Sequence, residues 1–192
     1  MKYLRLRKHL LFLKNFSDVL CTPLTILFNE SLRSGVFPSC WKKSFLIPIF
    51  KNGRRDDVNN YRGIANIPPI PKTFEKIIYD KIAPVIFDSL HPNQHGFERG
   101  KSTLTNLVEY TSFILKNMVD VGQVDAVYTD FSKAFDCVNH DLLLFKLIKL
   151  GVRSDLVNWF GSYLKGRTQM VMIVGSISGQ VSVKSGVPQG SH

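Results

Sequence analysis

The sequence predicts a chain of mixed helices and strands, of either the α/β or the α+β class. Apolar residues recur every three or four positions in several segments that end at glycine or proline, as in amphipathic helices. Short apolar runs bounded by turn-forming residues lie between these segments, as expected for strands. With 192 residues, 44% of them hydrophobic, the chain can bury a core. It contains no internal repeat and no low-complexity linker, so we expect one compact unit.

The first third of the chain is predicted to contain a helix, a strand and a loop. Residues 19–32 are rich in apolar side chains, and Gly35 and Pro38 end this helix. Residues 44–50 form a short apolar run that is typical of a buried strand. Residues 51–60 are polar and rich in turn formers, so we expect a loop that projects toward a ligand or solvent.

Two longer helices follow in the sequence. Residues 74–87 have helical spacing of apolar side chains, and Pro84 is expected to kink or end that helix. Residues 102–118 carry an apolar stripe on one face. We expect both stripes to be part of the core.

The pattern changes after Gly122. Residues 124–131 are predicted to form a strand, residues 142–150 a helix, and residues 156–164 another helix. Residues 169–174 and 179–184 are predicted to pair as a hairpin.

The charge of the chain favours a polyanionic partner. Lys and Arg number 25 against 15 Asp and Glu, which gives a formal charge of +10 and a pI near 9.6. Nucleic acid is the leading candidate. A basic protein with an ordinary solvated surface has the same composition, so charge alone leaves both interpretations open.

The cysteines and the N-terminus indicate an intracellular protein, in the nucleus or the cytoplasm. Cys21, Cys40 and Cys137 are odd in number and widely spaced, so neither a disulfide framework nor a zinc site is predicted. The apolar run at residues 10–13 is interrupted by Lys14 and is too short for a signal peptide. We expect no membrane span. A weak organellar-targeting interpretation stays open because no acidic residue precedes Asp18.

Two acidic residues mark the segment that carries most functional information. Asp130 ends an apolar run and Asp136 follows six residues later. Carboxylates at strand ends are suited to Mg²⁺-dependent phosphoryl transfer, because hard cations prefer oxygen ligands on a rigid scaffold. Alternatively, Asp130 merely ends a strand and Asp136 caps the next helix. The spacing does not distinguish these interpretations.

Two further clusters are weaker signals. Residues 185–191 contain two glycines and a proline, so the backbone can approach a ligand closely and hold Gln189 rigidly, although a plain turn is the simpler interpretation. Residues 94–103 end in a Ser-Thr helix cap behind Arg99 and Lys101. That arrangement suits a phosphate or, more simply, helix capping.

Six segments together resemble, in their order, the reverse transcriptases of non-long-terminal-repeat (LINE/jockey-like) retrotransposons. They are Trp41 with residues 48–51; residues 60–64 with Lys72 and residues 74–76; residues 94–97 with Ser102 and Thr103; residues 130–136 with Val138 and His140; Trp159 with residues 162–164, Arg167 and Gln169; and residues 186–191. The resemblance spans most of the chain. It implies an α+β right-hand polymerase, with an N-terminal helical extension of the fingers over residues 1–40 and the fingers and a partial palm over residues 41–192.

The resemblance also implies a catalytic centre. Asp130 matches the first catalytic aspartate, and with the backbone of Phe131 it would bind two Mg²⁺ ions, or Mn²⁺ in their place. These ions would activate a primer 3′-hydroxyl and stabilise the displacement of pyrophosphate. The implied partners are an RNA template, a DNA primer and deoxynucleoside triphosphates. The resemblance assigns no oligomeric state.

The same resemblance implies contacts to the nucleotide and template. Lys51 and Arg62 would grip the triphosphate, and Phe135 would crowd the sugar 2′ position. Gln189 would line the sugar and the template base. Backbone amides toward the nucleotide are implied for Ser132, Lys133 and Ala134, and template-contacting or structural roles for Pro188, Gly190 and Asp136.

Departures from the family pattern qualify this expectation. The family places a Tyr-x-Asp-Asp hairpin and a thumb beyond the point at which this sequence stops, after Ser191 and His192. One carboxylate cannot fix two octahedral Mg²⁺ shells, so we expect the isolated chain to be inactive. Gly63 replaces the usual proline, Glu98 a basic residue and His192 an apolar one, which indicates a decaying or truncated copy. A basic nucleic-acid-binding remnant and a translated pseudogene fragment without a role stay open as alternatives.

Overall fold

A computed structural model describes residues 11–190, which form two compact units. Unit 1 contains the chain up to Ile82 and again from Lys133, and unit 2 is Ala83–Ser132. The expectation of a single compact unit is therefore wrong. Linker composition could not reveal this division, because unit 2 is an insertion between two parts of unit 1 and has no polar linker at either border.

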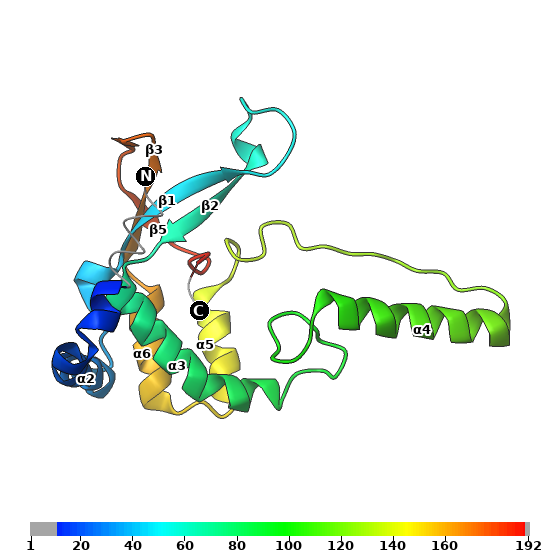
Figure 1. The fold of residues 1–192 in the computed structure, drawn as a ribbon, viewed down its shortest axis with the longest axis horizontal. Coiled ribbons are helices and arrows are strands. Elements are labelled where there is room, and N and C mark those ends of the chain that lie inside the picture. Colours follow the sequence, from blue (N-terminus) through cyan, green and yellow to red (C-terminus); the bar gives the residue numbers. More distant parts are fainter. Residues whose placement is uncertain (1–10, 191–192) are drawn as a thin grey trace. The chain divides into compact units, whose positions relative to one another are not determined.

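Unit 1 contains a mixed five-stranded sheet (Figure 1). Its strands run in the order β2-β1-β3-β4, and β5 also pairs with β3. β1 is antiparallel to β2 and parallel to β3. The strands are β1 (Lys43–Phe50), β2 (Tyr61–Asn66), β3 (Arg167–Ile173), β4 (Ser176–Ile177) and β5 (Val181–Val183).

The predicted strand over residues 44–50 and the predicted hairpin are both confirmed. β3 turns back at Val174 and Gly175, which have φ values of 44° and 88°. Positive φ at both central residues is the geometry of a two-residue hairpin turn whose twist matches its strands. β4 and then β5 pair antiparallel with β3 beyond this turn.

Unit 1 wholly or mainly contains the helices α2 (Ser17–Ser34), α3 (Pro69–Phe87), α5 (His140–Lys149) and α6 (Ser154–Leu164). The short 3₁₀ turns η1 (Ser39–Trp41) and η2 (Val58–Asn60) flank β1 and β2. α2 ends as predicted at Gly35, whose φ of 66° allows its N–H to bond the Leu32 carbonyl. α3 continues through Pro84, so the proline does not end this helix.

An aromatic cluster forms the core of unit 1. Phe74 of α3 is fully buried and stacks on Phe28 of α2, with ring centroids 4.3 Å apart. Trp159 of α6 lies 5.1 Å from the Phe74 ring and donates a hydrogen bond to Ser31 Oγ at 3.0 Å. Helix α2 therefore contributes directly to the core of unit 1.

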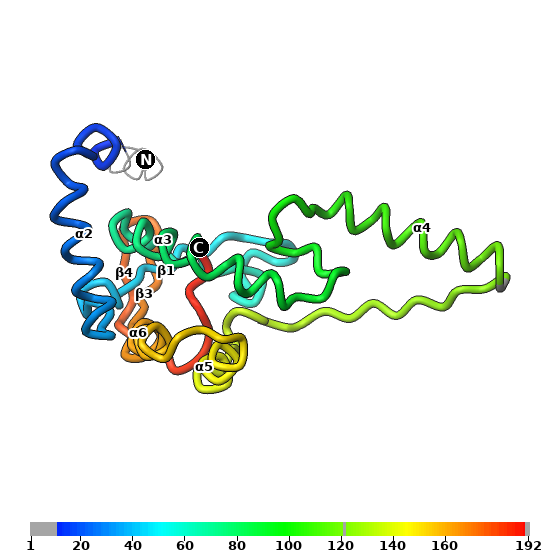
Figure 2. The backbone as a smooth tube through the Cα atoms, turned by 90° about the horizontal axis from the view of Figure 1, so that it is seen from below, coloured from blue at the N-terminus to red at the C-terminus, as the bar shows by residue number. Residues whose placement is uncertain are grey.

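Unit 2 consists of the end of α3, a loop, helix α4 (Thr103–Val121) and an extended segment that turns back beside α4 (Figure 2). The predicted strand over residues 124–131 is wrong, because these residues pair with no strand among residues 11–190. Apolar side chains indicated burial, but a strand also needs a backbone partner. The segment contacts α4 through Tyr128, whose hydroxyl is hydrogen-bonded to that of Tyr110.

The predicted helix over residues 102–118 is confirmed as α4, but its apolar face does not form a core. Leu107 is 55% exposed and Leu115 is 65% exposed. Within the described part of the chain, no helix is both long and apolar enough to cross a membrane.

Candidate functional site

A glycine-containing turn is fixed against the segment that carries Phe135 and Asp136. Gly186 N–H donates to the Val138 carbonyl and Val187 N–H donates to the Phe135 carbonyl, both at 2.8 Å. The buried ring of His140 contacts the Gly186 carbonyl through Nε2, also at 2.8 Å. His140 thus positions this turn, a role that the sequence did not assign. The position of His140, four residues after Asp136, was the sequence feature that could have indicated this role.

Gly186 is required at its position by space as well as by conformation. Its φ is +83°, and an added Cβ would lie 2.7 Å from the carbonyl oxygens of Phe135 and Asp136. We expect Gly186→Ala to lower the free energy of unfolding by more than the roughly 1–2 kcal/mol of left-handed strain alone. Urea unfolding measures the difference.

Gly151→Ala is the matched control, because Gly151 has a φ of +80° but no atom within 4 Å of an added Cβ. The control should therefore show only the conformational strain. Equal losses in the two variants would contradict a steric role for Gly186.

The turn continues onto the open edge of β2. Ala65 N–H donates to the Gln189 carbonyl at 2.7 Å. Gly190 follows with a φ of +120°, and an added Cβ there would lie 2.8 Å from the Ala65 carbonyl oxygen. The Pro188–Gln189–Gly190 backbone is therefore held against the sheet where a larger residue at position 190 would not fit.

A cavity of about 370 Å³ lies between this turn and the sheet. Its size is in the range of small-ligand sites. It brings together three residues that the sequence analysis proposed, Asp136, Pro188 and Gln189. The sheet contributes Ser44, Leu46, Gly63, Ala65, Arg167, Gln169, Ser182 and Val183.

Lys51 and Arg62 lie together on the other face of the β1–β2 hairpin. Arg62 is opposite Ile49 in the strand register, and Lys51 N–H continues the ladder by donating to the Asn60 carbonyl at 2.8 Å. Both side chains are exposed. Gly63, the neighbour of Arg62 on β2, lines the cavity. Because successive residues of a strand point to opposite faces, the Arg62 side chain points to the face opposite the cavity.

The loop between β1 and β2 is confirmed and carries its own hydrogen bonds. The Asp57 side chain accepts from Asn59 N–H, and Asn60 Nδ2 donates to the Arg54 carbonyl at 2.8 Å. Tyr61 donates its hydroxyl proton to the Arg55 carbonyl at 2.8 Å.

The acidic segment is divided between the two units. Asp130, Phe131 and Ser132 belong to unit 2, whereas Lys133 and Ala134 belong to unit 1. Asp130 is exposed and makes no hydrogen bond or ion pair with any residue from 11 to 190. In the same unit, the hydrogen bond to Tyr128 raises the pKa of the Tyr110 hydroxyl.

A tight turn begins at Lys133, which has a φ of +52° and whose carbonyl accepts from Asp136 N–H at 2.9 Å. Asp136 does not cap α5, contrary to one of the two interpretations of the sequence, because Asn139 does so by accepting from Leu142 N–H. The Asp136 carbonyl instead accepts from Ser185 Oγ at 3.1 Å. The described residues contain no group of three His, Cys, Asp or Glu side chains that could hold a metal.

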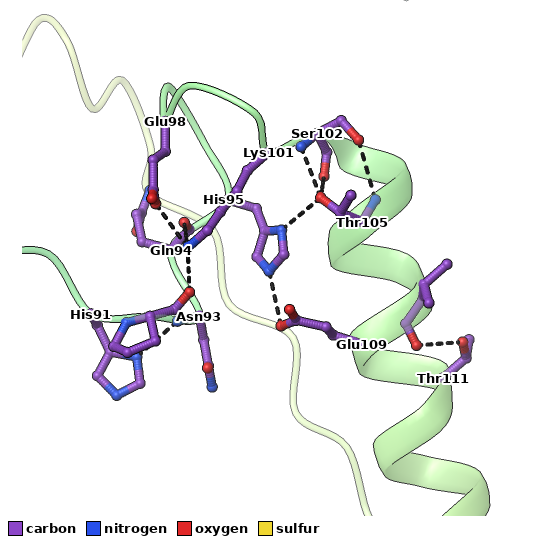
Figure 3. Close-up of polar contacts among 12 residues, drawn as sticks. His91, Asn93, Gln94, His95, Glu98, Lys101, Ser102, Thr105, Glu109 and Thr111 are labelled. Atoms are coloured by element: carbon purple, nitrogen blue, oxygen red, sulfur yellow. Dashed lines mark hydrogen bonds and ion pairs between the residues drawn. The ribbon is translucent and has the colours of Figure 1, made fainter. Parts of the chain in front are cut away.

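The cluster at residues 94–103 acts as a helix cap, as the simpler interpretation predicted (Figure 3). Ser102 and Thr105 form a capping box at the start of α4. The buried His95 ring bridges Thr105 Oγ1 at 2.9 Å and Glu109 Oε2 at 3.0 Å. Lys101 is used within the loop, because it donates to the carbonyls of Pro92 and Gln94.

Glu98 stands at a position where the resemblance predicts a basic residue. Its carboxylate forms an ion pair with Lys101 Nζ at 2.8 Å. The substitution is therefore accommodated by a local ion pair.

Comparison with known proteins gives consistent matches. Residues 48–192 match the family model described as reverse transcriptase (RNA-dependent DNA polymerase). The chain is 32% identical over 171 residues to a probable RNA-directed DNA polymerase from transposon BS of Drosophila melanogaster, and the match covers 88% of this chain and 19% of that protein.

Two further relatives come from other mobile elements. The RNA-directed DNA polymerase from mobile element jockey of the same species is 31% identical, with 88% of this chain and 19% of the relative covered. A Pol polyprotein from the retrotransposable element R2 of Popillia japonica is 26% identical, with 83% and 22% covered. The chain thus spans about a fifth of the length of these relatives.

Proposed function

Because this chain belongs to the reverse transcriptase family, we propose that it forms the fingers and part of the palm of an RNA-directed DNA polymerase from a non-long-terminal-repeat retrotransposon. The match over residues 48–192 carries the proposal. The packing of the turn at residues 186–190 against both β2 and the segment after Asp130 supports it. Residues 1–40 are proposed as a helical extension of the fingers, and residues 1–10 of this range lie outside the described part of the chain.

We propose Asp130 as a catalytic metal ligand, assisted by the backbone carbonyl of Phe131. The Asp130 carboxylate suits this role because it is exposed and engages no other described residue. Two Mg²⁺ ions, when bound, would activate the primer hydroxyl and offset the charge of the transferring phosphoryl group. A single carboxylate cannot fix two such ions, so further oxygen ligands must come from other segments of the polymerase.

We propose that Lys51 and Arg62 hold the triphosphate of the incoming nucleotide. Their common face on the β1–β2 hairpin lets both cations act on one polyanion. The backbone amides of Ser132, Lys133 and Ala134 are proposed to approach the same nucleotide.

Gln189 is proposed to line the sugar and the template base. Its backbone is fixed by the hydrogen bond to Ala65, and it lines the 370 Å³ cavity together with Pro188. Gly190 is proposed to allow the close approach to β2, and Asp136 to stabilise the turn. A basic nucleic-acid-binding remnant is the second candidate, because the net charge of +10 does not depend on catalysis.

Primer extension tests the polymerase proposal. The chain is fused to the palm and thumb of the jockey relative and given an RNA template, a labelled DNA primer and Mg²⁺ or Mn²⁺. We expect the fusion to add only the complementary deoxynucleotide, and we expect the isolated 192-residue chain to add none. A fusion that binds primer-template but never extends it would favour the second candidate.

Phe135 is proposed to exclude the ribose 2′-hydroxyl. Phe135→Val in the active fusion should raise ribonucleotide incorporation relative to deoxynucleotide incorporation by about tenfold to a hundredfold, because the cost of overpacking of about 1–3 kcal/mol is removed. Competing nucleotide incorporation on one template measures this ratio.

Phe145→Val is the control, because this exposed aromatic residue of α5 lies outside the proposed site, and it should leave the ratio unchanged. If Phe135 only stabilises the fold, Phe135→Val should lower the incorporation of both nucleotides together. An unchanged ratio in a folded, active variant would reject the steric assignment.

A further inference from the structure

A second cavity in unit 1, of about 530 Å³, lies between the N-terminus of α5 and the β3–β5 ladder. Its lining does not include Lys51 or Arg62, to which the proposed function assigns triphosphate binding, but it shares Arg167, Ser182, Val183, Lys184 and Ser185 with the 370 Å³ cavity. The side chains with hydrogen-bond donors that line it include Asn139, Lys165, Arg167, Ser182 and Lys184.

This cavity is basic. Lys165, Arg167 and Lys184 line it, against one carboxylate, that of Asp141, so its net charge is +2 with His140 neutral. Asp141 forms an ion pair with Lys165 at 3.2 Å, and both side chains are largely exposed. An exposed pair of this kind is weak. Arg167 and Lys184 therefore carry positive charges that no carboxylate lining the cavity neutralises.

Arg167 is the most unusual of these groups, because it is only 4% exposed. Its Nη1 donates to the Tyr163 carbonyl at 3.2 Å, and its guanidinium carbon lies 4.8 Å from the centre of the Tyr163 ring. No carboxylate of the described chain forms an ion pair with it. Buried charges are normally paired, and a guanidinium has five N–H groups to satisfy.

A second cation lies close to Arg167. Lys42 precedes β1, and its pKa is lowered first by partial burial and then by the charge of Arg167. The Lys42 ammonium contacts Ser162 Oγ at 3.5 Å but no carboxylate within the part of the chain that is described. Lys42 does not line the cavity, so it only adds to the positive charge around Arg167.

We propose that this cavity binds a phosphate group, held by Arg167 from the buried side and by Lys184 from the exposed side. A guanidinium fork and a mobile ammonium are complementary ways to bind phosphate oxygens. The phosphate belongs either to the backbone of a single-stranded nucleic acid or to a free polyphosphate such as that of a nucleotide. Which of these two molecules supplies the phosphate depends on the proposed function. The existence of the anion site does not, because it is argued from Arg167 and its surroundings alone.

Fluorescence anisotropy tests the proposal with the full chain and a labelled single-stranded RNA at several salt concentrations. The variants are Arg167→Gln and Lys184→Gln, with Lys146→Gln as control, because Lys146 is exposed and does not line the cavity. If the RNA backbone is the carrier, each cavity variant should weaken binding severalfold. Each should also reduce the slope of log K against log salt by about 0.7 for each RNA phosphate that the variant no longer neutralises, whereas the control should keep the wild-type slope or change it less.

Direct titration with inorganic triphosphate, followed by isothermal titration calorimetry, identifies the other source. If a free polyphosphate is the carrier, the two cavity variants should lose affinity for triphosphate more than Lys146→Gln does, with RNA binding unchanged. Circular dichroism checks folding, and if Arg167→Gln is unfolded the exposed Lys184 decides the result. Cavity variants equal to Lys146→Gln toward both probes would overturn the proposal. Since no step requires nucleotide incorporation, failure of the primer-extension assay leaves this result interpretable.

Discussion

Asp130→Asn should lower nucleotide incorporation by the fusion polymerase by about a thousandfold or more. The substitution keeps the size of the side chain but removes the negative charge that faces two divalent cations in the proposed site. Removing one preorganised electrostatic interaction with a transition state typically costs a factor of about 10² to 10³, and a metal ligand also fixes geometry. Single-turnover extension of a bound primer measures the effect on chemistry.

The control for this substitution is Asp125→Asn. Asp125 lies in the same extended segment, and its carboxylate accepts a hydrogen bond from Gln123 Nε2 at 2.9 Å. This variant should retain activity close to wild type, and both variants should bind primer-template equally. An Asp130→Asn enzyme that extends primers at the wild-type rate would exclude Asp130 as a metal ligand.

Local patterns predicted most of the elements of unit 1, because their signals are short-range. Gly35 ends α2 through its left-handed conformation, and apolar spacing predicted α5 and α6 within a few residues. The failures involve long-range partners. Residues 124–131 have the side chains of a strand, but whether a strand forms depends on a neighbouring backbone that the local sequence does not specify.

The candidate site shows the same division. The glycines and proline of residues 185–190 predicted a turn that approaches another backbone closely, and Gly186 and Gly190 do so. The sequence did not predict which backbone is approached, so the role of His140 was missed. Similarly, the alternation of side chains along a strand predicts that Arg62 and Gly63 lie on opposite faces of the sheet. Only the pairing register of β2 with β1 shows that Arg62 and Lys51 lie on the same face.

Phe74→Ala should lower the free energy of unfolding by about 3–5 kcal/mol, the usual cost of deleting a buried aromatic ring. Phe74 has no exposed surface, and its ring contacts side chains from α2 and α6 as well as Phe37. The deletion therefore leaves a cavity where three segments meet. Because domains are stable by only about 5–15 kcal/mol, this loss is a large share of the total. Urea unfolding at constant m-value measures the change.

Phe145→Ala is the matched control, since it removes the same ring from a half-exposed position on α5. There the Lys149 ammonium lies 4.9 Å from the centre of the ring, and such exposed contacts contribute about 0.5–1 kcal/mol. The two variants delete equal side-chain volume, so their difference isolates the effect of burial. If both lost the same small free energy, the aromatic cluster would not be the stabilising core of unit 1. If Phe74→Ala alone unfolds, helices α2, α3 and α6 depend on this one ring for their mutual packing.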